Sequence, residues 1–559
     1  MAMRQSPVRR APRRHLAFLL KSHYLADEFP SVLTTANFAK FCEDNLASLA
    51  PLPDLLKRVT RYGTFSAPRT TSTRRVLALP HPASQLALSR IITENLTDIR
   101  KTIRSCSLSL YNTDADYAHD RLFVGVDFKA RGVREAQVLS RYPYILKADI
   151  ANFFHTIYSH SLPWAVLGKQ WVKDVLELRN DPQRKTFDES WPNRLDMAIQ
   201  RGNSRETFGI PVGPDTSRMI AEILLSGIYA DASLSGMLKG QEGCRLVDDF
   251  FIGFDDEHAA RRCLDALRRV LWEYNLHLNE DKTDIKRSGQ FYDDGWKHDI
   301  ETFTIPKSST KAQRSAVQRL MEITLHHCST RNDPVPASFF CQRLTELEIM
   351  PANFEFVRDC LLRIARDFTT CLKAVVRFVT EYRLHFVDSE PLAIMRRYCR
   401  QIFAAHGPRG HDMEVVSALG ICGVLGIKVD KAFVQLRDGY ASPVVLAVLG
   451  LLGEEGLIKE PWDDWRPDMD GNIIDGPFWL PSYEAACRKW TNALEISESV
   501  AADPLFGMLA EHQVTFLDAS DFKGKATSLP LWKQGGRGQR AIQRGPVSSG
   551  RRSVVSEYE

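Results

Sequence analysis

Two adjacent aspartates, Asp248 and Asp249, lie between the apolar runs of the segment CRLVDDFFIGF. Adjacent carboxylates repel each other, and flanks this apolar usually enter a core, so the pair needs a compensating positive charge. A third carboxylate, Asp149, ends the segment YPYILKAD, which is rich in aromatic and β-branched residues. If the two segments pair in one sheet, two Mg²⁺ ions about 4 Å apart would neutralise the three carboxylates. Such a pair of ions stabilises the attacking and leaving oxygens of an in-line phosphoryl transfer.

Other Asp-Asp pairs occur at 255–256, 293–294 and 463–464. The first is expected to cap a helix, because short carboxylates accept hydrogen bonds from free backbone N–H groups. The other two are expected in solvated loops. Only Asp248-Asp249 has an apolar strand pattern on both sides, which makes it the catalytic candidate.

The elements that must position these carboxylates can be read from the hydrophobic pattern. Residues 144–150 predict a strand, and residues 244–254 predict a strand–turn–strand hairpin. Residues 209–232 predict a Gly/Pro loop followed by a helix, and residues 255–274 predict a second amphipathic helix. The order strand, helix, hairpin, helix predicts an α+β fold in which helices pack on one face of an antiparallel sheet.

The length of 559 residues is too great for one core, so two to four domains are expected. Residues 15–300 contain the carboxylate-bearing elements, and residues 301–530 predict a large all-α C-terminal domain. Two similar apolar segments about thirty residues apart in that part raise the prospect of an α-repeat. The basic ends, residues 1–14 and 531–559, lack the apolar content to fold and predict disordered arms.

Composition narrows the class of protein. The apolar fraction of 44% and the charged fraction of 25% are ordinary for a soluble globular protein, and the net charge of +4 neither requires nor excludes a nucleic-acid partner. The 11 cysteines form no CxxC pair, which argues against a zinc ribbon and a disulfide framework. The longest apolar run, 444–453, is too short to span a bilayer, and no secretory signal is visible. We expect a cytoplasmic protein without a membrane partner.

Four short motifs occur in order along the chain: ADIANFF, GIPVGPDTS, LVDDF and LNEDKT. This succession resembles the palm of reverse transcriptases, which contains an Asp-led strand, a Gly/Pro loop, a YxDD hairpin and a Lys-bearing turn. The resemblance implies right-hand polymerase fingers and palm over 15–300. It also implies an RNA-directed DNA polymerase with dNTP substrates, a DNA product and two Mg²⁺ ions, for which Mn²⁺ can substitute.

The resemblance assigns chemical roles residue by residue. Asp149 and Asp248 would bridge both metal ions, with Asp249 assisting. The backbone carbonyl of Ile150 would complete one coordination shell. Lys282 matches the lysine that protonates or neutralises the leaving pyrophosphate.

Nucleotide contacts are assigned in the same way. Phe154 matches the bulky aromatic residue beneath the sugar, where it would clash with a ribose 2′-OH and so favour dNTPs. Pro211 and Gly213 would form the loop under the incoming nucleotide and the template base. The fingers should supply a basic residue for the triphosphate, and Arg75 is the candidate. His160 matches a recurrent histidine, for which we expect a structural hydrogen bond.

Two positions depart from the family pattern. Leu246 replaces the usual tyrosine of YxDD, and Val212 replaces a polar residue before the loop glycine. Both positions normally touch primer or nucleotide. The apolar replacements remove hydrogen bonds and leave the metal ligands in place, so we expect activity with altered templating or processivity.

A narrower resemblance links the chain to bacterial abortive-infection and defence-associated reverse transcriptases. It rests on KSHYLADEFPSVLTTANFAKF, DIANFFHTIYSHSLPWA, GIPVGPDTSR and FYDDGWKHDI, and it covers about residues 20–300. No RNase H, HNH or integrase pattern follows the palm. The resemblance implies antiphage defence in the bacterial cytoplasm. Several members synthesise DNA without conventional templating, some prime from a protein hydroxyl, and others use a dedicated noncoding RNA.

Three alternatives stay open. A retron-like or group II-like enzyme would copy a bound noncoding RNA, with the basic arms as RNA contacts. A catalytically inactive palm scaffold would only bind nucleic acid, although three buried carboxylates without a metal would be costly. An RNA-dependent RNA polymerase usually has Gly before the Asp pair, where this chain has Val247, and a polar residue in place of Phe154. A helical domain of the predicted size could also assemble a homo-oligomer.

Overall fold

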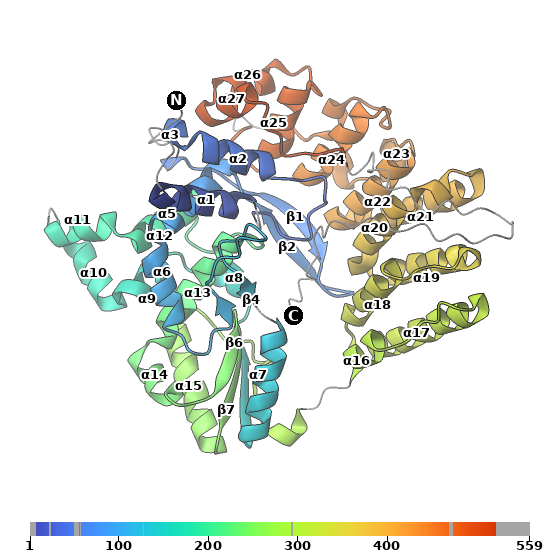
Figure 1. Ribbon diagram of the computed structural model, residues 1–559. Helices are drawn as coiled ribbons and strands as arrows, with labels where there is room; N and C mark the ends of the chain where they lie inside the picture. Colours follow the sequence, from blue (N-terminus) through green and yellow to red (C-terminus); the bar gives the residue numbers. More distant parts are fainter. Residues whose placement is uncertain are drawn as a thin grey trace.

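A computed structural model describes residues 7–21, 24–49, 55, 57–126, 128–179, 181–291, 295–468 and 473–520. The N-terminal part of the chain combines helices with a two-stranded ribbon (Figure 1): α1 (Pro7–Lys21), α2 (Ala36–Asp44), α3 (Leu46–Leu49), β1 (Gly63–Pro68), β2 (Arg74–Leu79), α5 (Pro82–Glu94) and α6 (Leu96–Arg104). The ribbon is antiparallel, with Gly63 opposite Leu79 and Pro68 opposite Arg74.

A four-stranded antiparallel sheet follows, with strand order β6-β7-β5-β8. β5 (Tyr144–Asp149) pairs with β7 (Asp249–Phe254) and β8 (Asp284–Arg287), and β6 (Gly243–Leu246) forms a hairpin with β7. The predicted strand and hairpin are therefore both confirmed. The other elements of this part are β3 (Tyr111–Asn112), β4 (Gly125–Val126), α7 (Phe128–Arg141), α8 (Phe153–Thr156), α9 (Ser161–Leu167), α10 (Lys169–Glu177), α11 (Pro182–Glu189), α12 (Trp191–Arg201), α13 (Asp215–Tyr229), α14 (Ala232–Leu238) and α15 (Glu257–Glu273).

Helices cover both faces of this sheet, because its strands place apolar side chains on both sides. Leu146 and Ala148 of β5 belong to the larger core with α13 and α15. Ile145 points the other way and packs with Val138 of α7 and Phe251 of β7. The α+β fold with an antiparallel sheet is confirmed, but the structure differs from the prediction of helices on one face. Large apolar residues at alternate positions require a cover on the second face as well.

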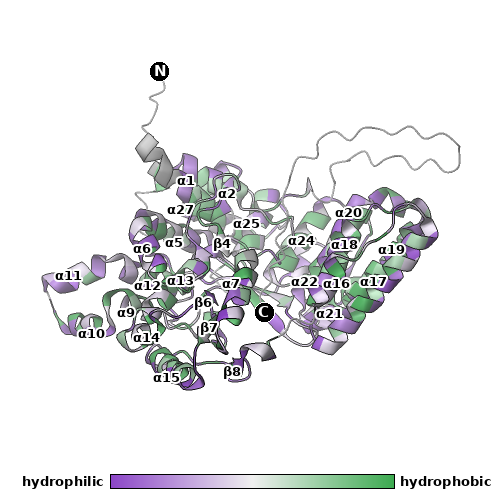
Figure 2. Ribbon diagram, turned by 60° about the horizontal axis from the view of Figure 1, so that its bottom comes forward, coloured by the Kyte–Doolittle hydropathy of each residue, from purple (hydrophilic) through white to green (hydrophobic). Residues whose placement is uncertain are grey.

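Helices alone make up the regular structure described beyond residue 295, which confirms the predicted all-α half. They are α16 (Trp296–Glu301), α17 (Thr310–Arg331), α18 (Val335–Thr345), α19 (Phe354–Asp367), α20 (Leu372–Glu381), α21 (Ser389–His406), α22 (Asp412–Leu425), α23 (Lys431–Val434), α24 (Pro443–Glu454), α25 (Trp479–Arg488), α26 (Leu494–Ala502) and α27 (Pro504–Glu511). Many of them have one polar and one apolar side (Figure 2). The two similar apolar segments lie in α22 and α24, which pack against each other, and the α-repeat stays a prediction.

One hydrophobic core joins the N-terminal part to the helical half. Buried residues between Leu16 and Leu86 form a single cluster with buried residues between Trp296 and Leu517, whereas the sheet has a core of its own. Figure 1 shows the blue helices α1 and α2 beside the red helices near the C-terminus. The cores therefore do not divide at residue 300, where the sequence pattern placed a domain boundary, because the first part of the chain completes the core of the last.

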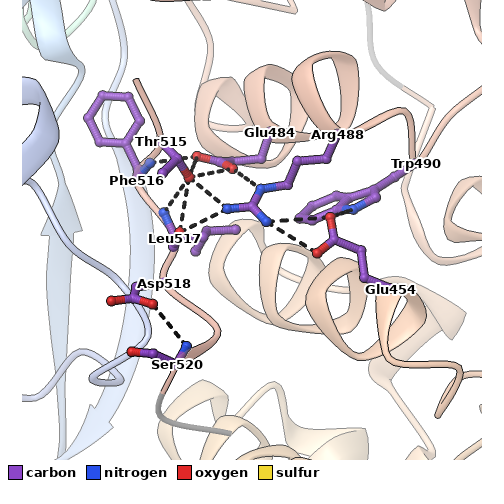
Figure 3. A network of polar contacts seen from close by, with 9 residues as sticks. All are labelled: Glu454, Glu484, Arg488, Trp490, Thr515, Phe516, Leu517, Asp518 and Ser520. Atoms are coloured by element: carbon purple, nitrogen blue, oxygen red, sulfur yellow. Dashed lines mark hydrogen bonds and ion pairs between the residues drawn. The ribbon is translucent and has the colours of Figure 1, made fainter. Parts of the chain in front are cut away.

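The last described segment is anchored to α25 by a buried carboxylate (Figure 3). Glu484 is 0% exposed, and it accepts hydrogen bonds from Arg488, the hydroxyl of Thr515 and the backbone N–H of Phe516. Arg488 also donates to the carbonyl of Leu517. This network fixes the segment against the helical half, close to the N-terminal elements.

The prediction of a disordered arm over residues 1–14 is wrong from residue 7 onward, because α1 begins at Pro7. Leu16 and Leu20 of this helix are buried in the shared core, and the helix continues from them toward the N-terminus. Residues 1–6 and the predicted tail, 531–559, lie outside the described residues. Within the described ranges, every helix is too short or too polar to cross a bilayer.

Candidate active site

The three predicted aspartates meet at one end of the sheet. Asp149, the last residue of β5, lies opposite Asp249, the first residue of β7. Asp248 occupies the hairpin turn, and its carbonyl accepts a 3.3 Å hydrogen bond from the backbone N–H of Ile150. Strand end and hairpin tip therefore converge as the sequence predicts.

A two-residue turn presents Asp248. Leu246 and Asp249 are paired, so that Val247 and Asp248 alone make the connection. Val247 has a φ of +53°, a left-handed conformation that is strained for a β-branched residue. Its side chain is buried in the sheet core, which anchors the turn while Asp248 remains at its tip.

The surroundings of this cluster disfavour the ionised form of two of its carboxyl groups when no cation is bound. Burial and the neighbouring charge of Asp149 raise the pKa of Asp248 from 3.8 to about 7. Burial also raises the pKa of Asp249, although Arg131 opposes this shift. The Oδ1 atom of Asp249 is buried without a hydrogen-bond partner among the described residues. The neighbouring basic groups of the protein therefore do not fully neutralise the negative charge of this cluster.

This donor set fits hard divalent cations. Mg²⁺ prefers oxygen ligands and binds through one or two carboxylates, while it retains water. Asp149, Asp248 and Asp249 supply carboxylate oxygens, and the backbone of Ile150 is tied to the same turn. An unsatisfied carboxylate oxygen and a raised pKa are the features that a bound cation would relieve.

Lys282 lies beside the same carboxylates. Its Nζ atom is 3.5 Å from Asp149 Oδ2, and its side chain is 40% exposed. The loop that carries it is fixed to the strand end by two backbone hydrogen bonds, from Asn279 N–H to the carbonyl of Asp149 and from Ala151 N–H to the carbonyl of His277. The structure therefore brings Lys282 to the cluster, where its ammonium group is paired with Asp149 and partly exposed.

Phe154 lies next to the Gly/Pro loop. Phe153 is buried in the sheet core, whereas Phe154 is only partly buried against it. The carbonyl of Phe154 accepts a hydrogen bond from the backbone N–H of Ile210, the residue before Pro211. The backbone of Phe154 and the loop are therefore neighbours, and the role of the ring in sugar selection stays a prediction.

Gly213 joins that loop to the N-terminal part. Its φ is +123°, and a Cβ atom built on it would lie 2.8 Å from the Cβ of Ala26. The preceding residue, Val212, accepts a hydrogen bond at its carbonyl from the backbone N–H of Ala78 on β2. Only glycine fits this conformation and this close approach, so Gly213 holds the loop, the ribbon and the N-terminal segment together.

The other predicted residues have clear surroundings. Arg75 lies on β2, with its Nη1 atom 3.6 Å from Glu28, so triphosphate binding by Arg75 would compete with an ion pair. His160 forms a 2.6 Å contact with the carboxylate of Asp196, which is almost fully buried. This bond confirms the expected structural hydrogen bond of His160.

Sequence reasoning missed two basic residues. Arg131 of α7 lies 2.6 Å from Asp249 and also pairs with Glu135. Arg245 of β6 is completely buried and pairs with Glu222 of α13. A charged residue inside the apolar hairpin could have drawn attention to Arg245, whereas nothing in the spacing of the chain indicates Arg131.

Residues 69–312 match the sequence model of the family described as reverse transcriptase (RNA-dependent DNA polymerase). The chain carries a reverse transcriptase domain. The match covers the carboxylate strand, the Gly/Pro loop, the hairpin and Lys282, and it makes the protein an RNA-directed DNA polymerase, a nucleotidyltransferase. No curated protein matches the chain.

Solved structures similar to the chain include telomerases of two yeasts. The telomerase of Candida albicans, in complex with a fragment of telomeric RNA, is 14% identical over 76% of this chain and 68% of that chain, with a TM-score of 0.27. The apo telomerase of Candida tropicalis is 10% identical over 76% and 71% of the two chains, with a TM-score of 0.28. Scores this low do not establish a common overall fold.

Proposed function

We propose that the reverse transcriptase domain synthesises DNA from dNTPs by two-metal-ion phosphoryl transfer and that the protein acts in antiphage defence. The observation that carries the polymerase chemistry is the carboxylate cluster. Asp149, Asp248 and Asp249 share one site. Burial and the neighbouring carboxylates raise the pKa of Asp248 and Asp249 there, so a cation would be needed to keep both ionised.

Each residue at the cluster has a role in this proposal. Asp149, Asp248 and the carbonyl of Ile150 would hold two Mg²⁺ ions, with Asp249 assisting, and Mn²⁺ can substitute. When bound, the ions supply electrostatic stabilisation of the attacking and leaving oxygens. Lys282 projects from the loop beside Asp149, where its ammonium group can donate a proton to the leaving pyrophosphate or neutralise its charge.

The neighbouring loop would select the nucleotide. Pro211 and Gly213 lie in a segment that is hydrogen-bonded to the backbone of Phe154 and to β2. This segment therefore links α8 to the ribbon. The partly buried ring of Phe154 would exclude a ribose 2′-OH by contact. Arg75 would then exchange Glu28 for the triphosphate of an incoming dNTP.

Two features favour synthesis without conventional templating or from a protein primer. Leu246 and Val212 are apolar at positions where the family has side chains that touch primer or nucleotide. Val212 packs against the shared core, so its side chain contributes to the stability of the fold. The motifs that resemble defence-associated reverse transcriptases support the same reading and the antiphage role.

Copying of a bound RNA is the second candidate. It is favoured by the description of the matched family, whose members are RNA-dependent. In this reading, the protein would hold an RNA template or a dedicated noncoding RNA, and the DNA product would be complementary to it.

One experiment tests both candidates. The purified full chain is incubated with labelled dNTPs and Mg²⁺, without added template or primer, and the product is sequenced after treatment with ribonuclease or protease. Protein-linked DNA of low complexity supports the first candidate. DNA complementary to a copurified RNA, lost after ribonuclease treatment, supports the second.

The defence role needs a separate test in cells. Bacteria that express the protein should resist a panel of phages better than bacteria that express the Asp248→Asn variant. Equal sensitivity of the two strains to every phage would remove the defence role, and it would leave the polymerase assay unaffected.

A further inference from the structure

Arg245 is a charged side chain in the interior of the sheet domain. Its side chain is 0% exposed, and it extends from β6, one strand away from the carboxylate cluster. Burial of a guanidinium group is unfavourable unless its N–H groups find acceptors. The acceptors that Arg245 uses therefore show what it holds in place.

Its first acceptor is Glu222, a carboxylate of α13 that is 1% exposed. Nη1 donates to Oε1 at 3.1 Å, and Nη2 donates to Oε2 at 2.8 Å. Glu222 is held in turn by the hydroxyl of Ser109 at 2.8 Å. The backbone near Ser109 also pairs with β6, because Arg245 N–H donates to the carbonyl of Leu108 and Leu110 N–H donates to the carbonyl of Arg245. The guanidinium group is therefore fixed from several sides.

Its second acceptor is the hairpin turn itself. Nη1 donates to the carbonyl of Val247 at 2.7 Å. This carbonyl belongs to the peptide group that joins Val247 to Asp248, so the hydrogen bond fixes the plane of that peptide. Val247 has a φ of +53°, which a β-branched residue adopts only when its surroundings impose it. Arg245 supplies part of that constraint.

We propose that Arg245 is a positioning residue: held by Glu222, it locks the left-handed turn at Val247 and so aims the carboxylate of Asp248 at the metal site. This inference rests on the proposed function. It also links the Gly/Pro loop to the hairpin, because Glu222 lies on α13, the helix that begins directly after the loop.

The main test removes the whole ion pair. Loss of one partner alone leaves a buried charge and can unfold the protein, whereas replacement of both by apolar residues is often neutral for stability. The variant Arg245→Met with Glu222→Leu should therefore keep the circular dichroism spectrum and a melting temperature close to wild type. Its kcat for dNTP incorporation should fall about 30-fold, while the KM for dNTP changes less than about threefold, since misplacement of a reacting group mainly affects the chemical step.

Metal binding gives a readout independent of catalysis. Mn²⁺ binding, followed by calorimetry without nucleotide, should weaken about tenfold in the same double variant. The matched control is Arg358→Met, which removes a guanidinium group of similar burial from α19 in the helical half. It should leave both kcat and Mn²⁺ affinity unchanged.

A rescue experiment separates turn geometry from general stability. Glycine adopts positive φ without strain. Addition of Val247→Gly to the double variant should therefore restore kcat and Mn²⁺ affinity several-fold, although it removes buried apolar surface. A structural role alone predicts a further loss. If the double variant fails to fold, Arg245→Lys serves as the second test, because the shorter ammonium group can keep Glu222 but not the Val247 carbonyl as well, and kcat should fall about tenfold.

The outcomes distinguish the inference from the function on which it rests. A wild-type protein without metal-dependent incorporation overturns the proposed function. An active wild type whose folded double variant retains its kcat within twofold and its Mn²⁺ affinity overturns the role of Arg245 and leaves the polymerase in place.

Discussion

Buried carboxylates occur in both halves of the molecule and differ in how their oxygens are satisfied. Glu414 and Glu484 of the helical half accept hydrogen bonds on both oxygens, whereas Oδ1 of Asp249 in the aspartate cluster has no hydrogen-bond partner among the described residues. Glu484 accepts hydrogen bonds from Arg488, Thr515 and Phe516, and Glu414 of α22 accepts from both terminal nitrogens of Arg74 on β2. In the sheet domain, Asp248 has a pKa raised to about 7 by burial and by the charge of Asp149.

The difference teaches how a structural carboxylate can be told from a catalytic one. Arg74 outweighs the burial of Glu414 and lowers its pKa, so this charge is neutralised by the protein. His406 and His411 lie close enough to Glu414 to suggest a metal site, yet both carboxylate oxygens are already engaged by Arg74. In the aspartate cluster, Oδ1 of Asp249 has no hydrogen-bond partner among the described residues, and under the proposed function a divalent cation would supply the missing positive charge.

The largest expected effect comes from a change in the aspartate cluster. Asp248→Asn should reduce dNTP incorporation at least about 1,000-fold, because a carboxylate that would hold the proposed metal ions is lost. The metal-free fold should persist, since the variant removes a carboxylate whose ionisation burial opposes. Primer extension and thermal melting measure the two effects. Asp255→Asn, at an exposed aspartate beyond β7, is the matched control, and near-normal activity of Asp248→Asn would falsify the metal assignment.

The pH dependence of stability should differ between the two kinds of carboxylate. The folded-state pKa of Asp248 is raised from 3.8 to about 7, so between these values the native state binds more protons than the unfolded state. The free energy of unfolding should therefore fall as pH rises from about 4 to 7, by at most about 4 kcal/mol from this group. Chemical denaturation of metal-free protein across this range measures the slope. Saturating Mg²⁺ or Asp248→Asn should flatten it, and an unchanged slope in both would contradict the assignment.

Lys282 tests whether the partly exposed ammonium group beside the cluster has a chemical role. Lys282→Met should lower kcat about 100-fold, because proton transfer to the leaving group is lost, while the melting temperature stays the same. Single-turnover kinetics measure the chemical step. Lys286→Met removes a lysine of similar exposure from β8 and should leave kcat unchanged. Equal kinetics of the two variants would exclude Lys282 from the reaction.

Glu414→Gln tests the structural side of the comparison. It should destabilise the protein by about 2 kcal/mol, because the partly exposed Arg74 loses its buried counter-charge. Incorporation per folded molecule should stay at the wild-type level. Urea denaturation and an activity assay at low temperature measure the two properties. A large loss of activity without a loss of stability would mean that the ribbon and α22 control the site directly.

The smallest expected effect concerns the selection of dNTP over rNTP. Phe154→Ala should lower the preference for dNTP over rNTP about tenfold, since one side-chain contact with the sugar contributes roughly 1–3 kcal/mol to discrimination. Competition between labelled dGTP and GTP measures the ratio of kcat/KM. Phe154→Leu keeps a bulky side chain and should retain most of the preference. An unchanged ratio in the alanine variant removes Phe154 from sugar selection.

Local patterns predicted much of the site. The strand 144–149 and the hairpin 243–254 follow from β-branched and aromatic residues with a short turn between them, and both exist with the expected carboxylates at their ends. The structure brings Lys282, which the resemblance assigned to the leaving pyrophosphate, beside Asp149, and its chemical role stays a prediction. Arg131 and Glu222 escaped prediction, because each meets its partner only after distant segments have packed.

The sequence by itself determined which residue types stand at the ends of which strands, because strand periodicity and turn chemistry are local properties of the chain. It determined the antiparallel sheet and the helical half for the same reason. Only the tertiary structure decided which carboxylates receive a partner from the protein and which do not. It also decided that the N-terminal residues complete the core of the C-terminal half, since charge compensation and burial depend on contacts between residues hundreds of positions apart.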